Sequence, residues 1–149
     1  MNIEIKLDSS CTVPKIVILT DQITEEIEAL VKKLESPQSL TGCRNGLNRE
    51  GVFEIIEQND IIRLYAASGK VFAVTEKGEY TLRLRLYELE ARLEASSFVR
   101  ISNSEIINLK KARSFDLSLA GTICVSLSNG DRSYVSRRCV SKVKQTLGI

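Results

Sequence analysis

The residues best suited to recognition chemistry form a polar triplet, Ser102–Asn103–Ser104, which interrupts a run of strand-forming residues in "FVRISNSEIINLKKARSF", residues 98 to 115. Small hydroxyl and amide side chains of this kind can hydrogen-bond the polar edges of a ligand. They can also cap the backbone at a strand break, and on these residues alone the capping role is favoured. Lys110 and Lys111 follow the triplet, and such a basic pair suits a polyanion.

Catalytic and metal chemistry find little support in the sequence. There is no histidine, so a Ser–His or Cys–His nucleophile and a mixed cysteine–histidine zinc site are impossible. No phosphate-binding glycine motif is present. The four cysteines form no CxxC pair and are expected to be ordinary reduced thiols: Cys11, Cys43, Cys124 and Cys139. We therefore expect no enzyme activity, no catalytic residues, no metal and no cofactor.

The composition predicts one ordinary domain with an aliphatic core. The chain has 149 residues, of which 43% are hydrophobic and 27% charged, and it has no tryptophan. No apolar run approaches the roughly 18 residues that a membrane span requires. The start, "MNIEIKLDSS", contains acidic residues and alternates in polarity, unlike a secretory signal. We expect a cytoplasmic protein without direct membrane insertion.

The net charge of +2 hides an asymmetry along the chain. Residues 1–50 and 51–96 each carry a balance of −2. Residues 97–149 contain nine Lys or Arg and three Asp or Glu, a balance of +6. This concentration is the electrostatic footprint expected of a face that binds a polyanion, although a basic surface without a partner is also possible.

Hydrophobic periodicity predicts two strands and a helix at the front of the chain. Apolar residues alternate over residues 2–7, and residues 15–20, "KIVILT", form a second strand candidate. Thr20 or Asp21 could cap a helix whose apolar residues recur at helical spacing up to Leu34. Pro37 then ends it.

The remainder is rich in short strands. Residues 41–51, "TGCRNGLNREG", are typical of a loop or hairpin. Strands are predicted over 52–58, 60–68, 70–78 and 79–84, followed by a helix bearing leucines 86, 89 and 93 on one face. After the opening stretch, Asn129–Gly130 marks a hairpin, and residues 137–149 can form a last helical turn or two. The sum is a β-rich α+β fold.

The order of four segments resembles the LytTR DNA-binding domain of bacterial transcription regulators. The segments are "IIRLYAASGKVFAVTEKGEYTLRLRLYELEARL", "FVRISNSEIINLKKA", "LSNG" and "YVSRRCVSKVKQTLG", and the resemblance covers about residues 50–149. It implies a LytTR-like fold of small, mostly antiparallel sheets with two or three short helices. It also implies that loops, rather than a recognition helix, enter the DNA grooves.

The resemblance further implies three DNA-contacting regions, and it reverses the preference for a capping role of Asn103. An asparagine amide can pair bidentately with adenine, serines can reach phosphate, and the Arg138 fork fits guanine or phosphate. Only one of the two arginines need face DNA. Lys110 and Lys111 could add attraction that is independent of sequence. The residues implied in the three regions are Ser68, Gly69 and Lys70; Ser102, Asn103 and Ser104; and Arg137 and Arg138.

We expect a division into residues 1–45, a small β/α extension that packs or dimerises, and residues 46–149, the LytTR-like domain. Family members often carry an N-terminal receiver domain that accepts a phosphoryl group, which needs roughly 120 residues. Only about 45 residues precede the resemblance, so a short, receiver-free regulator is expected. Its control would come from its abundance or from a regulatory protein or membrane-protein partner.

The favoured function is that of a sequence-specific regulator that binds double-stranded DNA as a homodimer on paired half-sites. The alternative is a protein-interaction module that uses the same β scaffold without DNA. An RNA-binding role is weaker, because RNA binders stack bases on exposed aromatic side chains and most aromatic residues here occupy strand positions that look buried. The operator, the target genes and the direction of regulation are not encoded in any motif of the sequence.

Overall fold

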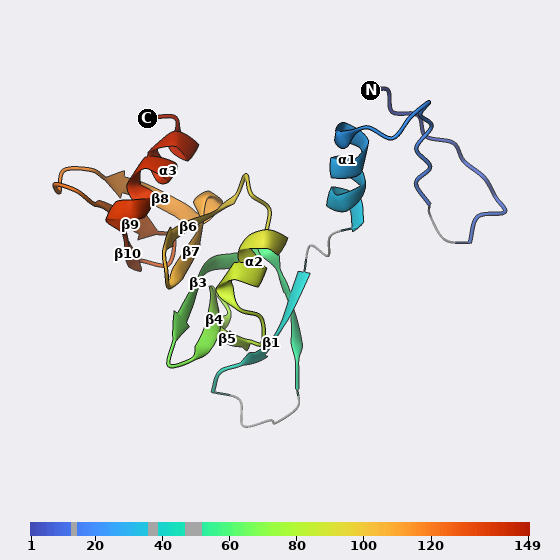
Figure 1. Cartoon of the computed structure of the whole chain (residues 1–149). Helices are drawn as coiled ribbons and strands as arrows, with labels where there is room; N and C mark the ends of the chain where they lie inside the picture. The colour runs from blue at the N-terminus through green and yellow to red at the C-terminus, as the bar shows by residue number, and fades with distance from the viewer. Residues whose placement is uncertain (13–14, 36–38, 47–51) are drawn as a thin grey trace. The chain divides into compact units, whose positions relative to one another are not determined.

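The chain folds into two compact units, residues 1–35 and residues 36–149. The structure is a computed structural model that describes residues 1–12, 15–35, 39–46 and 52–149 (Figure 1). The larger unit begins ten residues before the expected boundary near residue 45, because Leu40 is buried in its core and residues 39–44 pair with two of its strands.

The smaller unit contains one helix, α1 (Glu25–Glu35). It begins after Thr24, whose Oγ1 accepts the Ile27 N–H at 3.4 Å and whose carbonyl accepts the Glu28 N–H at 3.0 Å. The cap is therefore Thr24 rather than Thr20 or Asp21. Its hydroxyl is better placed because an N-cap side chain must reach the N–H groups of the first turn.

The two strands predicted at the front of the chain are wrong. The described residues 1–12 and 15–20 contain no strand, and Ile3, Ile5 and Leu7 are 91%, 85% and 98% exposed. Alternating polarity favours a strand only where another strand supplies hydrogen bonds and a core covers the apolar face. Within this unit neither is available.

The larger unit is built on a seven-stranded antiparallel sheet in the order β2-β1-β5-β4-β3-β7-β6. The predicted segment 41–51 supplies part of a hairpin, since β1 pairs with β2, while its residues 47–51 lie outside the described residues. The strands are β1 (Ser39–Arg44), β2 (Glu54–Glu57), β3 (Ile61–Ala67), β4 (Lys70–Thr75), β5 (Gly78–Leu82), β6 (Phe98–Ser102) and β7 (Glu105–Asn108).

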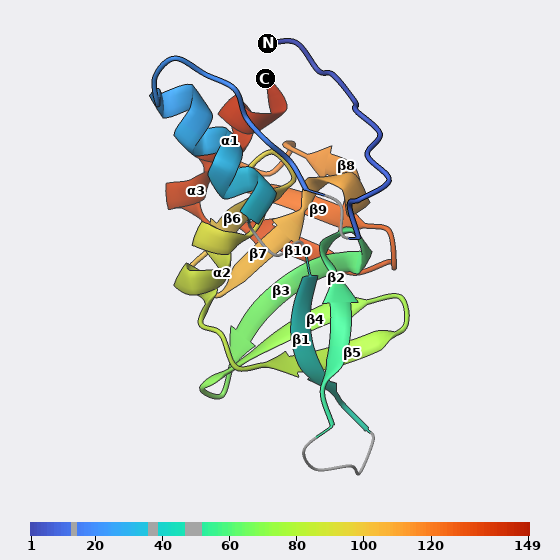
Figure 2. The ribbon, with the colours of Figure 1, turned by 90° about the vertical axis from the view of Figure 1, so that its right-hand side faces the viewer.

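A second sheet of three antiparallel strands, in the order β10-β9-β8, lies beside α3 (Figures 1 and 2). Its β9–β10 hairpin turns where Asn129–Gly130 predicted it. The predicted helix after β5 is confirmed as α2 (Leu86–Arg92), and the last helix, α3 (Arg137–Leu147), is longer than the expected turn or two. The remaining elements are β8 (Ala112–Asp116), β9 (Ile123–Leu127), β10 (Arg132–Val135) and the 3-10 turns η1 (Gln58–Asp60) and η2 (Leu109–Lys111).

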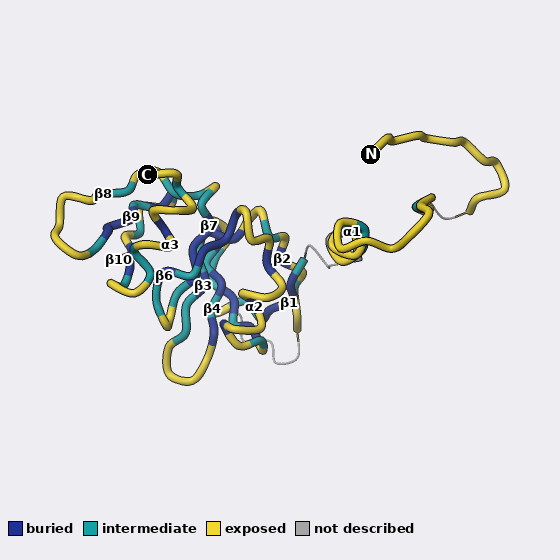
Figure 3. Tube along the Cα trace, turned by 45° about the horizontal axis from the view of Figure 1, so that its top comes forward, coloured by how far each residue is buried: buried dark blue, intermediate teal, exposed yellow. Residues whose placement is uncertain are grey.

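Two apolar cores lie on opposite faces of the strands β3, β7 and β6. Ile106 belongs to the core that α2 covers, and its neighbour Ile107 belongs to the core that β9, β10 and α3 cover. In the same way, Ile61 belongs to the core that α2 covers, and Ile62 belongs to the other core. Successive side chains of a strand point to opposite faces, so apolar neighbours require two cores. Figure 3 shows these central strands as mostly buried.

The cysteines behave as thiols in the described residues. Cys124 is buried in β9 and Cys139 packs against the second core, as small apolar side chains do. No group of three or more metal-binding side chains occurs within the described part of the chain. Across the same residues, none of the helices combines the length and the apolar character that a membrane span needs.

Gly42 allows β1 to lie close to the first core. A Cβ at this position would be 2.8 Å from Leu82 Cδ2, 3.0 Å from Ile56 Cδ1 and 3.1 Å from Tyr80 Cβ. All three neighbours are at most 5% exposed, so they have little room to move.

Replacing Gly42 by alanine should therefore lower the free energy of unfolding by about 1–3 kcal/mol, through overpacking. Thr41→Ala, at the exposed neighbouring position, is the matched control and should change it little. Urea unfolding followed by circular dichroism measures both. Equal stability of the two variants would show that β1 can move away from the core without cost.

Candidate nucleic-acid interface

Two hairpin turns leave the sheet side by side at one end. The β3–β4 turn consists of Ser68 (φ 52°) and Gly69 (φ 75°), and two positive φ angles define a tight type I′ turn. The β6–β7 turn contains Asn103 and Ser104. The Ala66 N–H donates to the Ser104 carbonyl at 2.8 Å, which joins the two hairpins where the turns begin.

The start of α3 lies against the same turn. The Ser136 N–H donates to the Ile101 carbonyl at 2.8 Å, and the Arg138 guanidinium donates through Nη2 to Asn103 Oδ1. Arg137 instead lies near Gly121, where a Cβ would be 3.6 Å from Arg137 Nε. Of the two predicted arginines, only Arg138 contacts the triplet.

The N-terminus of α3 offers features that suit an anion. The backbone N–H groups of a first helical turn carry partial positive charge. Ser136 Oγ is buried and has no hydrogen-bond partner among the described residues. With Arg137 and Arg138 exposed in this first turn, the helix start is positive and hydrogen-bonding in character.

Arg100 fixes the backbone conformation of the triplet. Its Nε donates to the Ser102 carbonyl at 2.7 Å and its Nη2 to the Asn103 carbonyl at 2.6 Å. Its third nitrogen, Nη1, is 3.0 Å from Glu90 Oε2 on α2, and the other oxygen of Glu90 is 3.7 Å from Lys142 Nζ on α3. One guanidinium thus links the turn directly to α2, and Glu90 extends the connection to α3; only an arginine fork offers three such donors.

Carboxylates near the turns are neutralised by close partners. Glu105, next to Ser104, accepts from Ser133 Oγ at 2.6 Å and pairs with Arg63 at 3.2 Å. Arg63 is also 3.2 Å from Asp131. A free carboxylate beside a polyanion would repel it, and these pairs reduce that repulsion.

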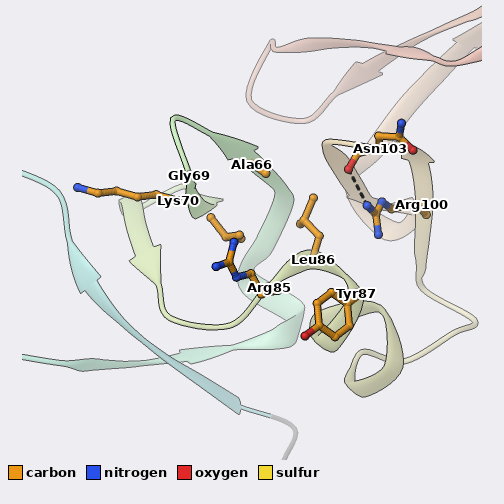
Figure 4. A pocket seen from close by; sticks show the side chains of 9 residues that line it. Ala66, Gly69, Lys70, Arg85, Leu86, Tyr87, Arg100 and Asn103 are labelled. Carbon is orange, nitrogen blue, oxygen red and sulfur yellow. Dashed lines mark hydrogen bonds between the residues drawn. The ribbon is translucent and has the colours of Figure 1, made fainter.

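A hollow of about 520 Å³ lies between the β3–β4 turn, the β6–β7 turn and the start of α2. Figure 4 shows Arg100 and Asn103 on one side of it, with Gly69 opposite and Arg85, Leu86 and Tyr87 between them. The side chain of Lys70 extends away from the hollow in this view. The hollow could take a sugar or phosphate edge, with cationic groups on two sides.

Sequence reasoning missed Arg85, Tyr87 and Arg100 at this interface. The helical phase of α2 could have identified Tyr87, because a position next to the buried Leu86 points outward, and Tyr87 is 70% exposed. Most aromatic residues were expected at buried strand positions, but Tyr134 on β10 is 58% exposed. No local signal marks Arg100, because its role depends on a turn and two helices that only the tertiary fold brings together.

Lys110 and Lys111 are not part of this cluster. They lie in η2, which follows β7 at the end opposite to the triplet. Four strand residues span about 14 Å. The Lys111 carbonyl accepts from Ser128 N–H at 2.8 Å, which places this lysine beside the β9–β10 turn.

Tyr65 supports the β3–β4 hairpin from the sheet. Its ring lies 5.1 Å from that of Phe72, and its hydroxyl donates to Glu79 at 2.9 Å. Burial raises the pKa of Tyr65, and the hydrogen bond to Glu79 raises it further. The phenol therefore stays neutral and donates at physiological pH.

Residues 52–148 match the family of the LytTr DNA-binding domain. The chain belongs to this family. A relative in Staphylococcus aureus strain NCTC 8325, named as an uncharacterized HTH-type transcriptional regulator, is 33% identical over 131 residues, which cover 88% of this chain and 84% of the relative. A regulator of the bovine strain RF122 matches over the same length with the same identity.

The LytTR fold expected from the sequence is confirmed by a solved LytTr DNA-binding domain from Bacillus cereus. That structure has a TM-score of 0.69 and 23% identity, and the match covers 76% of this chain and 99% of the solved chain. The staphylococcal relatives are named after a helix-turn-helix, but in the described part of this LytTR chain consecutive helices are separated by strands. A helix pair therefore does not form this candidate interface.

Arg100→Lys should weaken binding to a preferred duplex by roughly tenfold while the net charge stays the same. A lysine cannot hold two carbonyls and Glu90 together, so the triplet loses its fixed shape. Arg92→Lys, at the exposed end of α2, is the matched control. Fluorescence anisotropy on one duplex measures both, and unchanged affinity of the Arg100 variant would remove this positioning role.

Proposed function

We propose that this LytTR protein is a sequence-specific, double-stranded DNA-binding transcription regulator. The observation that carries the proposal is the convergence of the β3–β4 turn, the β6–β7 turn and the start of α3 on one edge of the fold. Three polar, mostly exposed segments joined by backbone hydrogen bonds form a fixed edge that can present donors and acceptors to a DNA groove. A regulator of this kind acts in the cytoplasm, where its DNA is.

Asn103 and Arg138 are the proposed base-reading residues. Arg138 donates to Asn103 Oδ1, which fixes the direction of the amide. A carbonyl oxygen has two lone pairs, so Oδ1 can still accept from an adenine N6 while Nδ2 donates to N7. The remaining N–H groups of Arg138 can reach a guanine or a phosphate.

The other predicted residues are proposed to position the protein on the DNA backbone. Ser68, Gly69 and Lys70 lie at an exposed turn, and Ser102 and Ser104 flank the reader. Lys110 and Lys111, one strand length away, would act through charge alone on a flanking phosphate. Arg137, directed toward Gly121, would do the same.

The protein is proposed to bind as a dimer on two half-sites. One protomer offers two turns and one helix start, which reach too few bases for a useful specificity ratio. Two copies on paired half-sites double the number of bases read, and this is the common solution among small DNA-binding modules.

Selection of bound sequences from random duplex DNA tests the function and yields the preferred site. Asn103→Ala or Arg138→Ala should then cost about 1–3 kcal/mol per protomer on that site and much less on random DNA. Lys110→Ala, the matched control, should weaken binding to both DNAs equally. If selection enriches no sequence, the alternative of a protein-interaction module on the same scaffold gains support.

A thermal melt distinguishes readout from capping in the same variants. If Asn103→Ala lowers the melting temperature by several degrees and leaves the specificity ratio unchanged, the triplet is a structural cap. The Asn103/Arg138 double variant should cost less than the sum of the single variants, because residues in contact are coupled.

Binding should also be salt-sensitive. If each protomer neutralises about four to six phosphates, log K should fall against log salt with a slope of roughly −4 to −5. Lys110→Ala should flatten the slope by about one unit. A titration series by fluorescence anisotropy measures both values, and a slope near zero would contradict the electrostatic contribution.

A further inference from the structure

The first 35 residues expose an unusual amount of apolar surface. Nine of the seventeen large apolar side chains that are exposed among the described residues lie in this segment, which is less than a quarter of the chain. Figure 3 shows the segment as almost entirely exposed. Water-exposed apolar surface of this extent marks a binding surface.

The apolar side chains of α1 form one face. Ile27, Leu30, Val31 and Leu34 recur at helical spacing, while Ala29 and Lys32 lie elsewhere on the helix. The stripe is accompanied by Ile23, which precedes the helix and is 76% exposed. Within this face Leu34 is 50% exposed, and Ile27, Leu30 and Val31 are half-buried. An amphipathic helix of eleven residues is only marginally stable alone, so a partner that covers the exposed remainder would stabilise it.

The charges of α1 favour a second copy of the same helix. Its first turn carries Glu25, Glu26 and Glu28, and Lys32 lies near its other end. When two copies lie antiparallel with Leu30 near the centre, the acidic first turn of each protomer lies alongside the end of the other that carries Lys32. The pattern is therefore complementary to itself, as a two-fold interface must be.

The same segment is shared with relatives beyond the DNA-binding domain. The alignment with the Staphylococcus aureus regulator covers 88% of this chain, whereas the family match begins at residue 52. It therefore extends well into the segment that precedes the family match. A segment that is aligned together with the DNA-binding domain fits a role in that domain's own assembly.

We propose that residues 1–35 form the dimerisation element of this protein, with α1 packed antiparallel against α1 of a second copy. The exposed aliphatic residues before α1 enlarge the contact. This proposal depends on the proposed function in one respect: binding to paired half-sites requires two protomers. Dimerisation itself needs no DNA.

The test is sedimentation equilibrium of the full-length chain without DNA, from about 1 to 100 µM. The wild-type protein should be a dimer within this range. Leu30→Glu should raise the dissociation constant at least roughly tenfold, whereas Ala29→Glu, with the same charge one position away on the other face, should not. A monomeric wild-type chain, or an equal effect of the two variants, would overturn the proposal.

A charge exchange tests the pairing even if Leu30→Glu disturbs the fold. In a homodimer Glu28→Lys and Lys32→Glu each bring like charges to the same end of the helix pair, so each should dimerise more weakly. A mixture of the two variants should form a heterodimer in which opposite charges again share each end. Failure of the mixture to associate better than either variant would exclude the antiparallel arrangement.

DNA binding separates this proposal from the proposed function. Leu30→Glu should bind one half-site as the wild-type chain does and lose only the gain on paired half-sites. A wild-type dimer that selects no DNA sequence would refute the proposed function and leave the dimerisation element standing. A wild-type monomer that selects a specific DNA sequence would refute the dimerisation element and support the proposed function.

Discussion

Strand β7 is apolar on both faces, and the position of the whole candidate interface depends on this. Ile106 and Ile107 are 1% and 0% exposed, yet they belong to different cores. The strand therefore needs α2 on one side and β9, β10 and α3 on the other. A slip of one residue would exchange the two cores, so the register of β7 is strongly specified. The β6–β7 turn at its end is fixed with it.

Asn108 is the last residue of β7, and its buried side chain helps to fix this end of the strand. It is 1% exposed, and its Nδ2 donates to the Ile61 carbonyl at 2.8 Å while its Oδ1 accepts the Lys110 N–H at 3.0 Å. Both polar atoms are thus paired, which removes the cost of burying them. The same side chain ties β3 to the start of η2. The triplet and the two lysines consequently leave opposite ends of one rigid strand.

The sequence predicted most of the larger unit and little of the smaller one. Residue patterns predicted β2 to β5 and α2, and the Asn129–Gly130 turn signal predicted the β9–β10 hairpin, because in each case the local pattern agrees with the core that covers it. The alternating residues 2–7 carry the same kind of pattern but no partner strand within their own unit. The triplet and Arg138 were predicted as site residues, and the structure brings them into contact. Arg100 was missed, because it contacts residues that are distant in sequence or depend on the shape of a turn.

The contact between Arg138 and Asn103 has a consequence for how sequence could be read. In the free protein the Asn103 Oδ1 already accepts a hydrogen bond from the charged Arg138 guanidinium, so the side-chain amide is oriented before DNA arrives. Ordering a side chain in advance lowers the entropy cost of binding, which otherwise reduces affinity. Under the proposed readout, this orientation would also penalise the wrong base. Guanine would set its O6 acceptor against the Asn103 Oδ1, and a pyrimidine would offer no N7 acceptor to Nδ2. An unpaired polar group in a dehydrated groove costs more than a good pair gains, so the proposed readout would discriminate mainly by rejection. Arg100, which holds the backbone of the turn, would contribute to the same rejection, because a turn free to bend would let the Asn103 amide move away from a mismatched base.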